Sequence, residues 1–260
     1  MATTFEQATR LQAKDDIEFL VHLDPDWSIG RGVYGGLLAA LLLKAFEERA
    51  SLGRPRSLTV QYCAPATPGP ARLQARLARQ GTRTQMLVGS IEDQHGLVAQ
   101  ALATFGLSRT DERILDPTPP PAVAPPERLE PPPASPIMPT FTQHLDYRLC
   151  LGAMPYSGAD QGLLGGWIRW REPRPHDFVG LAALLDAWPP AVLPLYDKPI
   201  KAATAELTYH FLSDELPQDD WLLFEATCPS LAAGYAEEQA SLWSRRGKLL
   251  ARAYQLVTIG

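Results

Sequence analysis

The sequence predicts an α+β fold built from two similar units, each with one apolar helix followed by antiparallel strands. Three observations support this expectation: an early helix without a polar face, a proline-rich stretch near the middle of the 260 residues, and the same order of elements on both sides of that stretch. A chain of this length can form two units of roughly 130 residues, each with its own core.

The first helix is predicted over Leu37 to Ala50. It begins LLAALLL, so two turns have no polar face, whereas Lys44, Glu47 and Glu48 return its end to solvent. A helix that is apolar on every side must be enclosed by other elements, and the strands that follow are the available cover. A long helix wrapped by an antiparallel sheet is the hotdog architecture.

The strands follow the same order in both halves of the chain. In the first half, SLTVQYCAP alternates like a strand, and TQMLVGSIEDQHGLVAQALATFG predicts two strands joined by a turn at residues 93–96. In the second half, a helix over about Phe178 to Trp188 precedes AELTYHFLS and DWLLFEATCP, and the last segment predicts two strands that turn at residues 244–247. This duplication predicts a double hotdog: two tandem hotdog domains, each with a curled antiparallel sheet wrapped around a central helix.

The boundary between the halves is predicted at the stretch from Pro117 to Pro139, where 11 of 23 residues are proline. Such a composition excludes a helix or a central strand and favours an extended polyproline connector. We therefore expect an N-terminal domain over residues 1–116, a linker over 117–139 and a C-terminal domain over 140–260.

Composition excludes several classes of protein. No apolar run approaches the ~20 residues of a membrane span, and the N-terminus lacks the pattern of a signal peptide, so we expect a cytoplasmic protein. A net charge of −5 argues against nucleic-acid binding. Three widely spaced cysteines and five histidines form no metal-binding motif, so neither a metal nor another cofactor is expected.

The stretch GRGVYGG matches the dinucleotide-binding pattern G-x-G-x-x-G through Gly30, Gly32 and Gly35. That function needs a strand that ends at the first glycine and an acidic residue about 20 positions further on, at the end of a second strand. The predicted strand ends too early, at Leu23, and the next strand ends without an acid. The glycines are instead interpreted as a turn into a crowded core, or as a close-approach loop whose N–H groups polarise a carbonyl.

In their order, spacing and duplication, several segments resemble the acyl-CoA thioesterase II family of double-hotdog enzymes. They are GRGVYGGLLAALLLKAF and SLTVQYCAP in the first half, and LLDAWPPAVLP, ATAELTYHF and LLARAYQLV in the second. The resemblance covers nearly the whole chain apart from the proline connector. It implies hydrolysis of acyl-CoA thioesters to free acid and CoA, with acyl-CoA as the partner, and it is compatible with a homo-oligomer.

The resemblance also implies the site, because in that family an Asp, a Ser or Thr and a Gln hold and activate a water. By position the Asp is Asp186, the hydroxyl is Thr204 and the amide is Gln255. Thr208 is a second candidate for the hydroxyl, since the family's Asp-His-Ser-type strand reads Glu-Leu-Thr here. The candidates for substrate binding are Gly35, Gly36 and Thr208.

The chemistry of these residues leaves alternatives open. Asp186 has apolar neighbours, so it is either a buried base with a raised pKa or a carboxylate that ends a helix before Pro189. Gln255 lies among apolar residues and either orients a water or faces solvent at an edge strand. Its equivalent in the first half is Ala103, so the first half lacks the amide.

Two other functions stay open on the same fold. The first is a non-catalytic acyl-binding or ligand-binding protein, which the altered Glu-Leu-Thr strand favours. The second is an enoyl-thioester hydratase or dehydratase, which needs an Asp and a His in the site helix. No histidine follows Asp186 closely, and no G-x-S-x-G sequence offers a serine nucleophile.

Overall fold

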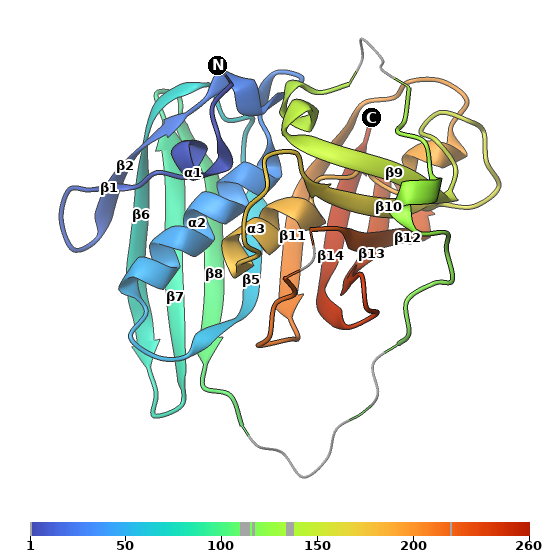
Figure 1. Ribbon diagram of the computed structural model, residues 1–260. Helices are drawn as coiled ribbons and strands as arrows, with labels where there is room; N and C mark the ends of the chain where they lie inside the picture. Colours follow the sequence, from blue (N-terminus) through green and yellow to red (C-terminus); the bar gives the residue numbers. More distant parts are fainter. Residues whose placement is uncertain (1, 110–114, 116–117, 134–137, 219) are drawn as a thin grey trace.

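The computed structural model describes residues 2–109, 115, 118–133, 138–218 and 220–260. Its main feature is a 12-stranded sheet with the order β1-β2-β6-β7-β8-β5-β11-β14-β13-β12-β10-β9 (Figure 1). The strands of the first half are β1 (Gln12–Ala13), β2 (Glu18–Leu23), β5 (Arg54–Tyr62), β6 (Gly69–Gln80), β7 (Thr84–Asp93) and β8 (Gly96–Gly106). Those of the second half are β9 (Leu145–Gly152), β10 (Leu163–Trp170), β11 (Ala202–Phe211), β12 (Leu222–Ala232), β13 (Tyr235–Ser244) and β14 (Leu249–Ile259).

The two halves of the sheet meet where β5 pairs with β11. At this junction Thr59 lies opposite Thr208, and their hydroxyl oxygens are 3.0 Å apart. On either side of the junction the strands belong to one half of the chain each. The strands of the two similar halves therefore form one continuous hydrogen-bonded sheet, in which β5 and β11 occupy equivalent places.

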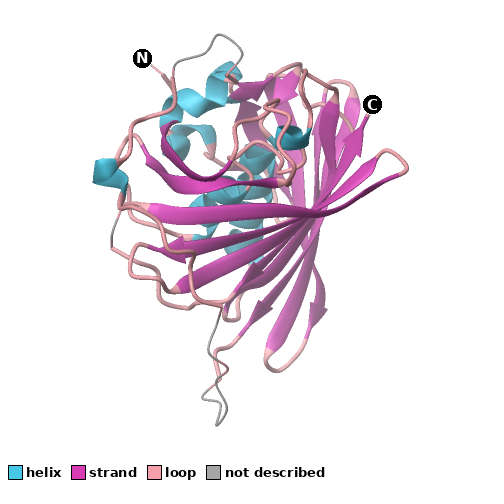
Figure 2. Cartoon of the chain, turned by 90° about the vertical axis from the view of Figure 1, so that its right-hand side faces the viewer, coloured by secondary structure: helices cyan, strands magenta, loops and turns pink. Residues whose placement is uncertain are grey.

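Both main helices lie on the same side of the sheet (Figure 2). The longer helix, α2 (Gly35–Arg49), packs against β5, β6, β7 and β8, and the residues from Leu37 to Leu43 are at most 2% exposed. The shorter helix, α3 (Phe178–Leu185), packs against α2 and reaches β13 and β14. The helix predicted over 37–50 is thus confirmed, with its apolar first turns buried and Glu47 and Glu48 near its end exposed. A four-residue helix, α1 (Phe5–Ala8), lies near the N-terminus.

The predicted turns at residues 93–96 and 244–247 are confirmed, because β7 and β13 each return as the next strand at these places. The second helix ends earlier than the expected Trp188, at Leu185. Proline cannot continue a helix and disfavours helical geometry in the residue before it. The pair Pro189 and Pro190 therefore stops α3 near this point, and Asp186 becomes its C-cap.

The glycine cluster before α2 does not form a dinucleotide loop. Gly30 has a positive φ of 56° and makes the turn of a small hairpin, β3 (Ser28–Ile29) with β4 (Gly32–Val33). Every strand pairing among the described residues is antiparallel, so the parallel sheet that such a loop requires is not formed there.

The described part of the proline-rich connector contains no α-helix and no strand, only a short 3-10 turn at Pro126–Arg128. Two tryptophans of the second half hold it by their indole N–H groups: Trp167 donates to the carbonyl of Ala124 at 2.9 Å, and Trp243 donates to that of Thr118 at 3.2 Å. Residues 116–117 and 134–137 lie outside the described residues, and with them the expected limit between 116 and 117. In the described residues, no helix has the length and apolar character needed to cross a membrane.

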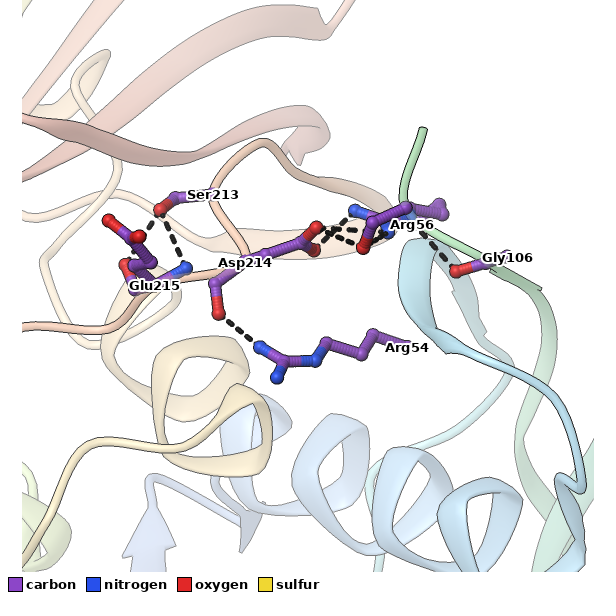
Figure 3. A network of polar contacts seen from close by, with 7 residues as sticks. Arg54, Arg56, Gly106, Ser213, Asp214 and Glu215 are labelled. Atoms are coloured by element: carbon purple, nitrogen blue, oxygen red, sulfur yellow. Dashed lines mark hydrogen bonds and ion pairs between the residues drawn. The ribbon is translucent and has the colours of Figure 1, made fainter. Parts of the chain in front are cut away.

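A polar network also ties the halves together (Figure 3). Arg56 on β5 forms two hydrogen bonds with the Asp214 carboxylate, at 2.6 and 3.3 Å, and donates to the carbonyl of Gly106 at 3.2 Å. Ser108 donates to the same carboxylate, and Arg54 donates to the backbone carbonyl of Asp214. Because Asp214 lies three residues after the end of β11, this network holds the β5 end of the first half against the second half.

We predict that Asp214→Ala lowers the free energy of unfolding by about 1–2 kcal/mol at pH 7, since a paired arginine loses its carboxylate. The hydrogen bond from Arg56 lowers the pKa of Asp214 below its ordinary value. This stabilisation is therefore complete above about pH 4 and is lost as the pH falls through the native pKa. Urea unfolding at pH 7 and pH 3.5 measures the deficit, with the exposed Asp197→Ala as control. A deficit of equal size at both pH values would contradict the ion-pair explanation.

Candidate functional site

Asp186 lies where the C-terminal end of α3 meets the N-terminal end of α2. A Cβ atom placed on Gly35 would lie only 2.8 Å from Oδ2 of Asp186 and 3.2 Å from the ring of Tyr62. The backbone N–H of Gly36 donates a hydrogen bond to the Asp186 carboxyl. Glycine at position 35 is therefore required for a steric reason: a side chain there would push the carboxyl away from the start of α2.

A side chain is excluded at position 36 as well, because a Cβ atom on Gly36 would overlap the ring and hydroxyl of Tyr34. From the sequence, one of the two interpretations of these glycines is a loop whose N–H groups polarise a carbonyl. In the structure the Gly36 N–H faces the Asp186 carboxyl. The reason is electrostatic, since an exposed N–H at a helix start carries partial positive charge and attracts the nearest carboxylate.

Three side chains hold the segment that carries Asp186. Tyr34 donates its hydroxyl hydrogen to the carbonyl of Ala183, before Asp186. Tyr147 of β9 donates to the carbonyl of Ala187 at 3.0 Å, directly after it. Further along, the backbone N–H of Ala191 donates to the carboxyl of Glu238 on β13. Contacts before and after Asp186 in the sequence thus fix the position of this residue.

Gln255 and Thr204 lie together on neighbouring strands. The Gln255 amide nitrogen donates to the hydroxyl of Thr204, and Gln255 is only 8% exposed. A break in the β11–β14 register between Thr204 and Glu206 accompanies this contact. Thr208 does not join them, because it alternates with the buried Leu207 and faces the other side of the sheet, where it meets Thr59.

The register of the sheet supports the expected equivalence of Gln255 and Ala103. Leu58 of β5 lies opposite Ala103 on β8, and Leu207 of β11 lies opposite Gln255 on β14. Leu58 and Leu207 are both fully buried in the matching sequences SLTV and ELTY. The first half therefore carries a methyl group where the second half carries the amide.

Glu238 is a polar residue of this region that the sequence analysis missed. It lies directly opposite Gln255 in the β13–β14 pair and is only 6% exposed. The signal was present in YAEEQASLW, since a period of two puts Glu238 on the same face as the buried Ala236 and Ala240. Glutamates in a surface strand are common enough that the inward one was not recognised.

The two carboxyl groups influence each other's protonation. Burial, with the charge of Glu238, raises the pKa of Asp186 to about 8, although the Gly36 N–H acts in the opposite direction. Burial raises the pKa of Glu238 to about 7, opposed by its hydrogen bond from Ala191. As whole residues, Asp186, Tyr62 and Thr204 keep intermediate solvent accessibility.

Tyrosine hydroxyls surround Asp186 on its other sides. Tyr62 donates to the carbonyl of Gly35 at 3.1 Å. The Tyr209 hydroxyl is fully buried and forms no hydrogen bond of ordinary geometry with the described residues. Burial raises the pKa of Tyr34, Tyr62 and Tyr209 well above the ordinary value, so these groups act only as neutral hydrogen-bonding partners. The described residues bring together no group of three His, Cys, Asp or Glu side chains that could hold a metal ion.

Two family models match the two halves of the chain. The acyl-CoA thioesterase N-terminal domain matches residues 23–106, and the acyl-CoA thioesterase C-terminal domain matches residues 117–259. The chain belongs to the acyl-CoA thioesterase family. The resemblance predicted from the sequence is thereby confirmed, and with it an activity toward acyl-CoA thioesters in general.

Solved structures of similar fold align with almost the whole length of this acyl-CoA thioesterase family member. A conserved protein of unknown function with a hotdog fold from Alicyclobacillus acidocaldarius has a TM-score of 0.89 and 28% identity, over 98% of this chain and 97% of that one. The tesB protein of Mycobacterium avium subsp. paratuberculosis has a TM-score of 0.83 and 16% identity, over 98% of both chains. The acyl-CoA thioesterase II TesB2 of Mycobacterium marinum has a TM-score of 0.81 and 18% identity, over 99% of this chain and 98% of that one. The two mycobacterial proteins support the hotdog fold alone. No curated protein sequence matches the chain.

We predict that Asp186→Asn stabilises the protein at basic pH. A carboxyl whose native pKa is raised contributes stability that is complete below about pH 4 and is lost as the pH rises through about 8. Asparagine keeps an acceptor for the Gly36 N–H and removes the buried charge. The variant should exceed the wild type by about 1–3 kcal/mol at pH 9 and equal it near pH 4.5. Thermal unfolding at both pH values measures this difference, and a wild type that is more stable than the variant at pH 9 would contradict it.

Proposed function

We propose that the protein hydrolyses acyl-CoA thioesters to the free acid and CoA, with a water activated by Asp186 and held by Thr204 and Gln255. The observation that carries the proposal is an arrangement of polar groups in which Glu238, the charged neighbour of Asp186, lies directly opposite Gln255. Its elements are the Asp186 carboxyl at the end of α3 and the Gln255–Thr204 hydrogen bond across β14 and β11. Membership of the acyl-CoA thioesterase family supports the substrate class.

In this proposal the Asp186 carboxylate accepts a proton from the water as the water oxygen attacks the thioester carbonyl carbon. The tetrahedral intermediate then collapses, the carbon–sulfur bond breaks, and the CoA sulfur leaves and takes up a proton. A base with a pKa near 8 suits this role, because a more basic carboxylate removes the proton from water more readily. No covalent enzyme intermediate is required.

Thr204 and Gln255 serve as the fixed part of the water site. Gln255 donates one amide hydrogen to Thr204, so the threonine hydroxyl can direct its own hydrogen and a lone pair toward a water. The amide keeps its carbonyl oxygen and a second hydrogen for further bonds. Gly35 and Gly36 enter the proposal as the residues that let Asp186 reach the start of α2, which holds its charged form.

We further propose that the architecture is a double hotdog in the full sense, with each half of the sheet curled around its own helix, α2 or α3. The single-sided placement of both helices and their contacts with the strands support this description. The divisions at residues 1–116, 117–139 and 140–260, and a cytoplasmic location, belong to the same proposal.

We predict that purified wild-type protein releases free thiol from acyl-CoAs and that Asp186→Asn lowers kcat by about 10²–10⁴-fold. The loss of the general base explains this effect, and the variant's stability excludes unfolding as its cause. A thiol-release assay over a panel of acyl-CoAs makes the measurement, with the exposed Asp197→Asn as the matched control. Full activity in Asp186→Asn would remove Asp186 from the mechanism, and a wild type without hydrolysis would leave ligand binding or enoyl-thioester hydration as the alternatives.

A second prediction separates the two threonines of β11. Thr204→Ala should lower kcat by about 10–10³-fold, because the water loses a fixed hydrogen-bonding partner. Thr208→Ala should change kcat by less than about threefold, since its side chain meets Thr59 on the other face of the sheet. The same thiol-release assay decides between them, and a larger loss in Thr208→Ala would transfer the hydroxyl role to that residue.

A further inference from the structure

Glu238 is the buried acidic residue of the sheet beside the proposed site. On β13 the residues that share its face are Ala236, Ala240 and Leu242, all at most 4% exposed. Glu238 itself is 6% exposed and lies directly opposite Gln255 on β14. A carboxyl group in such surroundings is costly unless it is bonded or neutralised, so its presence calls for a physical explanation.

We propose that Glu238 is a positioning residue of the hydrolytic site, which holds the loop behind Asp186 and places a second carboxyl group opposite Gln255. This inference rests on the proposed function, because it assigns Glu238 a role in the same reaction. Glu238 does not have to touch the substrate or the water; it acts through Asp186 and the loop.

The Ala191 N–H donates a hydrogen bond to the Glu238 carboxyl. Between Asp186 and Ala191 the chain contains Pro189 and Pro190, whose fixed φ angles make this stretch stiff. Tyr147 holds its beginning at Ala187, and Glu238 holds its end. Loss of the Glu238 bond would therefore release one end of a short, stiff segment whose other end carries the proposed base.

The charges around Asp186 and Glu238 also link the two carboxyl groups. The groups that act on Asp186 are Glu238 from β13 and the Gly36 N–H from α2. The charge of Asp186 in turn adds to burial in raising the pKa of Tyr34, Tyr62 and Tyr209. On the neighbouring strand β12, burial and then the charge of Glu238 raise the pKa of the Cys228 thiol. Among the described residues that act on these two carboxyls, none carries a positive charge. Two carboxylates in such surroundings do not ionise independently, so they titrate as a pair.

The direction of this coupling follows from the sign of the charges. An ionised Glu238 disfavours ionisation of Asp186 and so keeps Asp186 protonated to higher pH. Removal of the Glu238 charge should therefore let Asp186 ionise at lower pH. The rising limb of the pH–activity profile, which reports this ionisation, should move to lower pH in the same variant.

The test measures kcat and KM for thiol release from one acyl-CoA between pH 5.5 and 9.5. Glu238→Gln keeps an oxygen that can accept from the Ala191 N–H and removes only the charge. We expect its rising limb about one pH unit below that of the wild type, with kcat on the plateau within about threefold. Glu238→Ala removes the loop contact too, so its plateau kcat should fall at least about 10-fold while KM changes less.

Glu237→Gln is the matched control, since it makes the same change one residue earlier on the exposed face of β13. Its profile should superimpose on that of the wild type. A Glu238→Gln profile identical to the wild type, or a Glu238→Ala plateau equal to it, would overturn the proposal. If Glu238→Ala fails to fold, the Glu238→Gln profile alone decides.

These measurements distinguish failure of the proposed role of Glu238 from failure of the proposed hydrolytic function. An inactive wild type, or a fully active Asp186→Asn, overturns the hydrolytic mechanism, whereas an active wild type with a normal Glu238→Gln profile overturns only the role of Glu238. Thermal unfolding gives a readout that needs no activity. Because burial raises the pKa of Glu238 to about 7, Glu238→Gln should gain stability over the wild type at pH 9 and not at pH 4.5. An equal difference at both pH values would contradict the charge coupling.

Discussion

The structure depends on the burial of one carboxyl group, that of Asp186, between the end of one helix and the start of another. This position is costly for a charge, and several features of the chain reduce the cost together. Glycine at positions 35 and 36 permits the approach, and the Gly36 N–H binds the carboxyl. The cost that remains appears as a pKa raised to about 8. A carboxyl in this state is mostly protonated at pH 7 and becomes available as a base as the pH rises toward 8.

The two halves contribute to this region in different ways. The first half supplies the start of α2 with Tyr34 and, from β5, Tyr62. The second half supplies the carboxyls, Gln255 and Thr204. Duplication places two equivalent regions in the sheet, but the first has Ala103 where the second has the amide. The proposed site is therefore formed once per chain, with contributions from both halves. The β5–β11 pairing and the Asp214 network hold the halves in the one relative position that this site requires.

The sequence was most informative where local pattern decides the structure. The seven apolar residues at the start of α2 can only be buried, and the turns at residues 93–96 and 244–247 follow from composition and alternation. Contacts between distant segments were less accessible. No residue near Gly35 in the sequence indicates that the Asp186 carboxyl is what excludes a side chain at position 35. Glu238 shows the same limit, since its burial depends on which face of β13 is covered, and α3 packs there from a distant part of the chain. The early end of α3 was readable from Pro189 and Pro190, but the predicted helix ran past it.

The central claim is that Asp186 is a buried carboxyl with a strongly raised pKa, held at the start of α2. The most direct measurement is a titration of its carboxyl carbon by NMR in ¹³C-labelled protein, with Asp186→Asn to assign the signal. We expect a midpoint above pH 7, close to the value of about 8 that burial and Glu238 produce. A midpoint near 4, the ordinary value for an exposed aspartate, would contradict it.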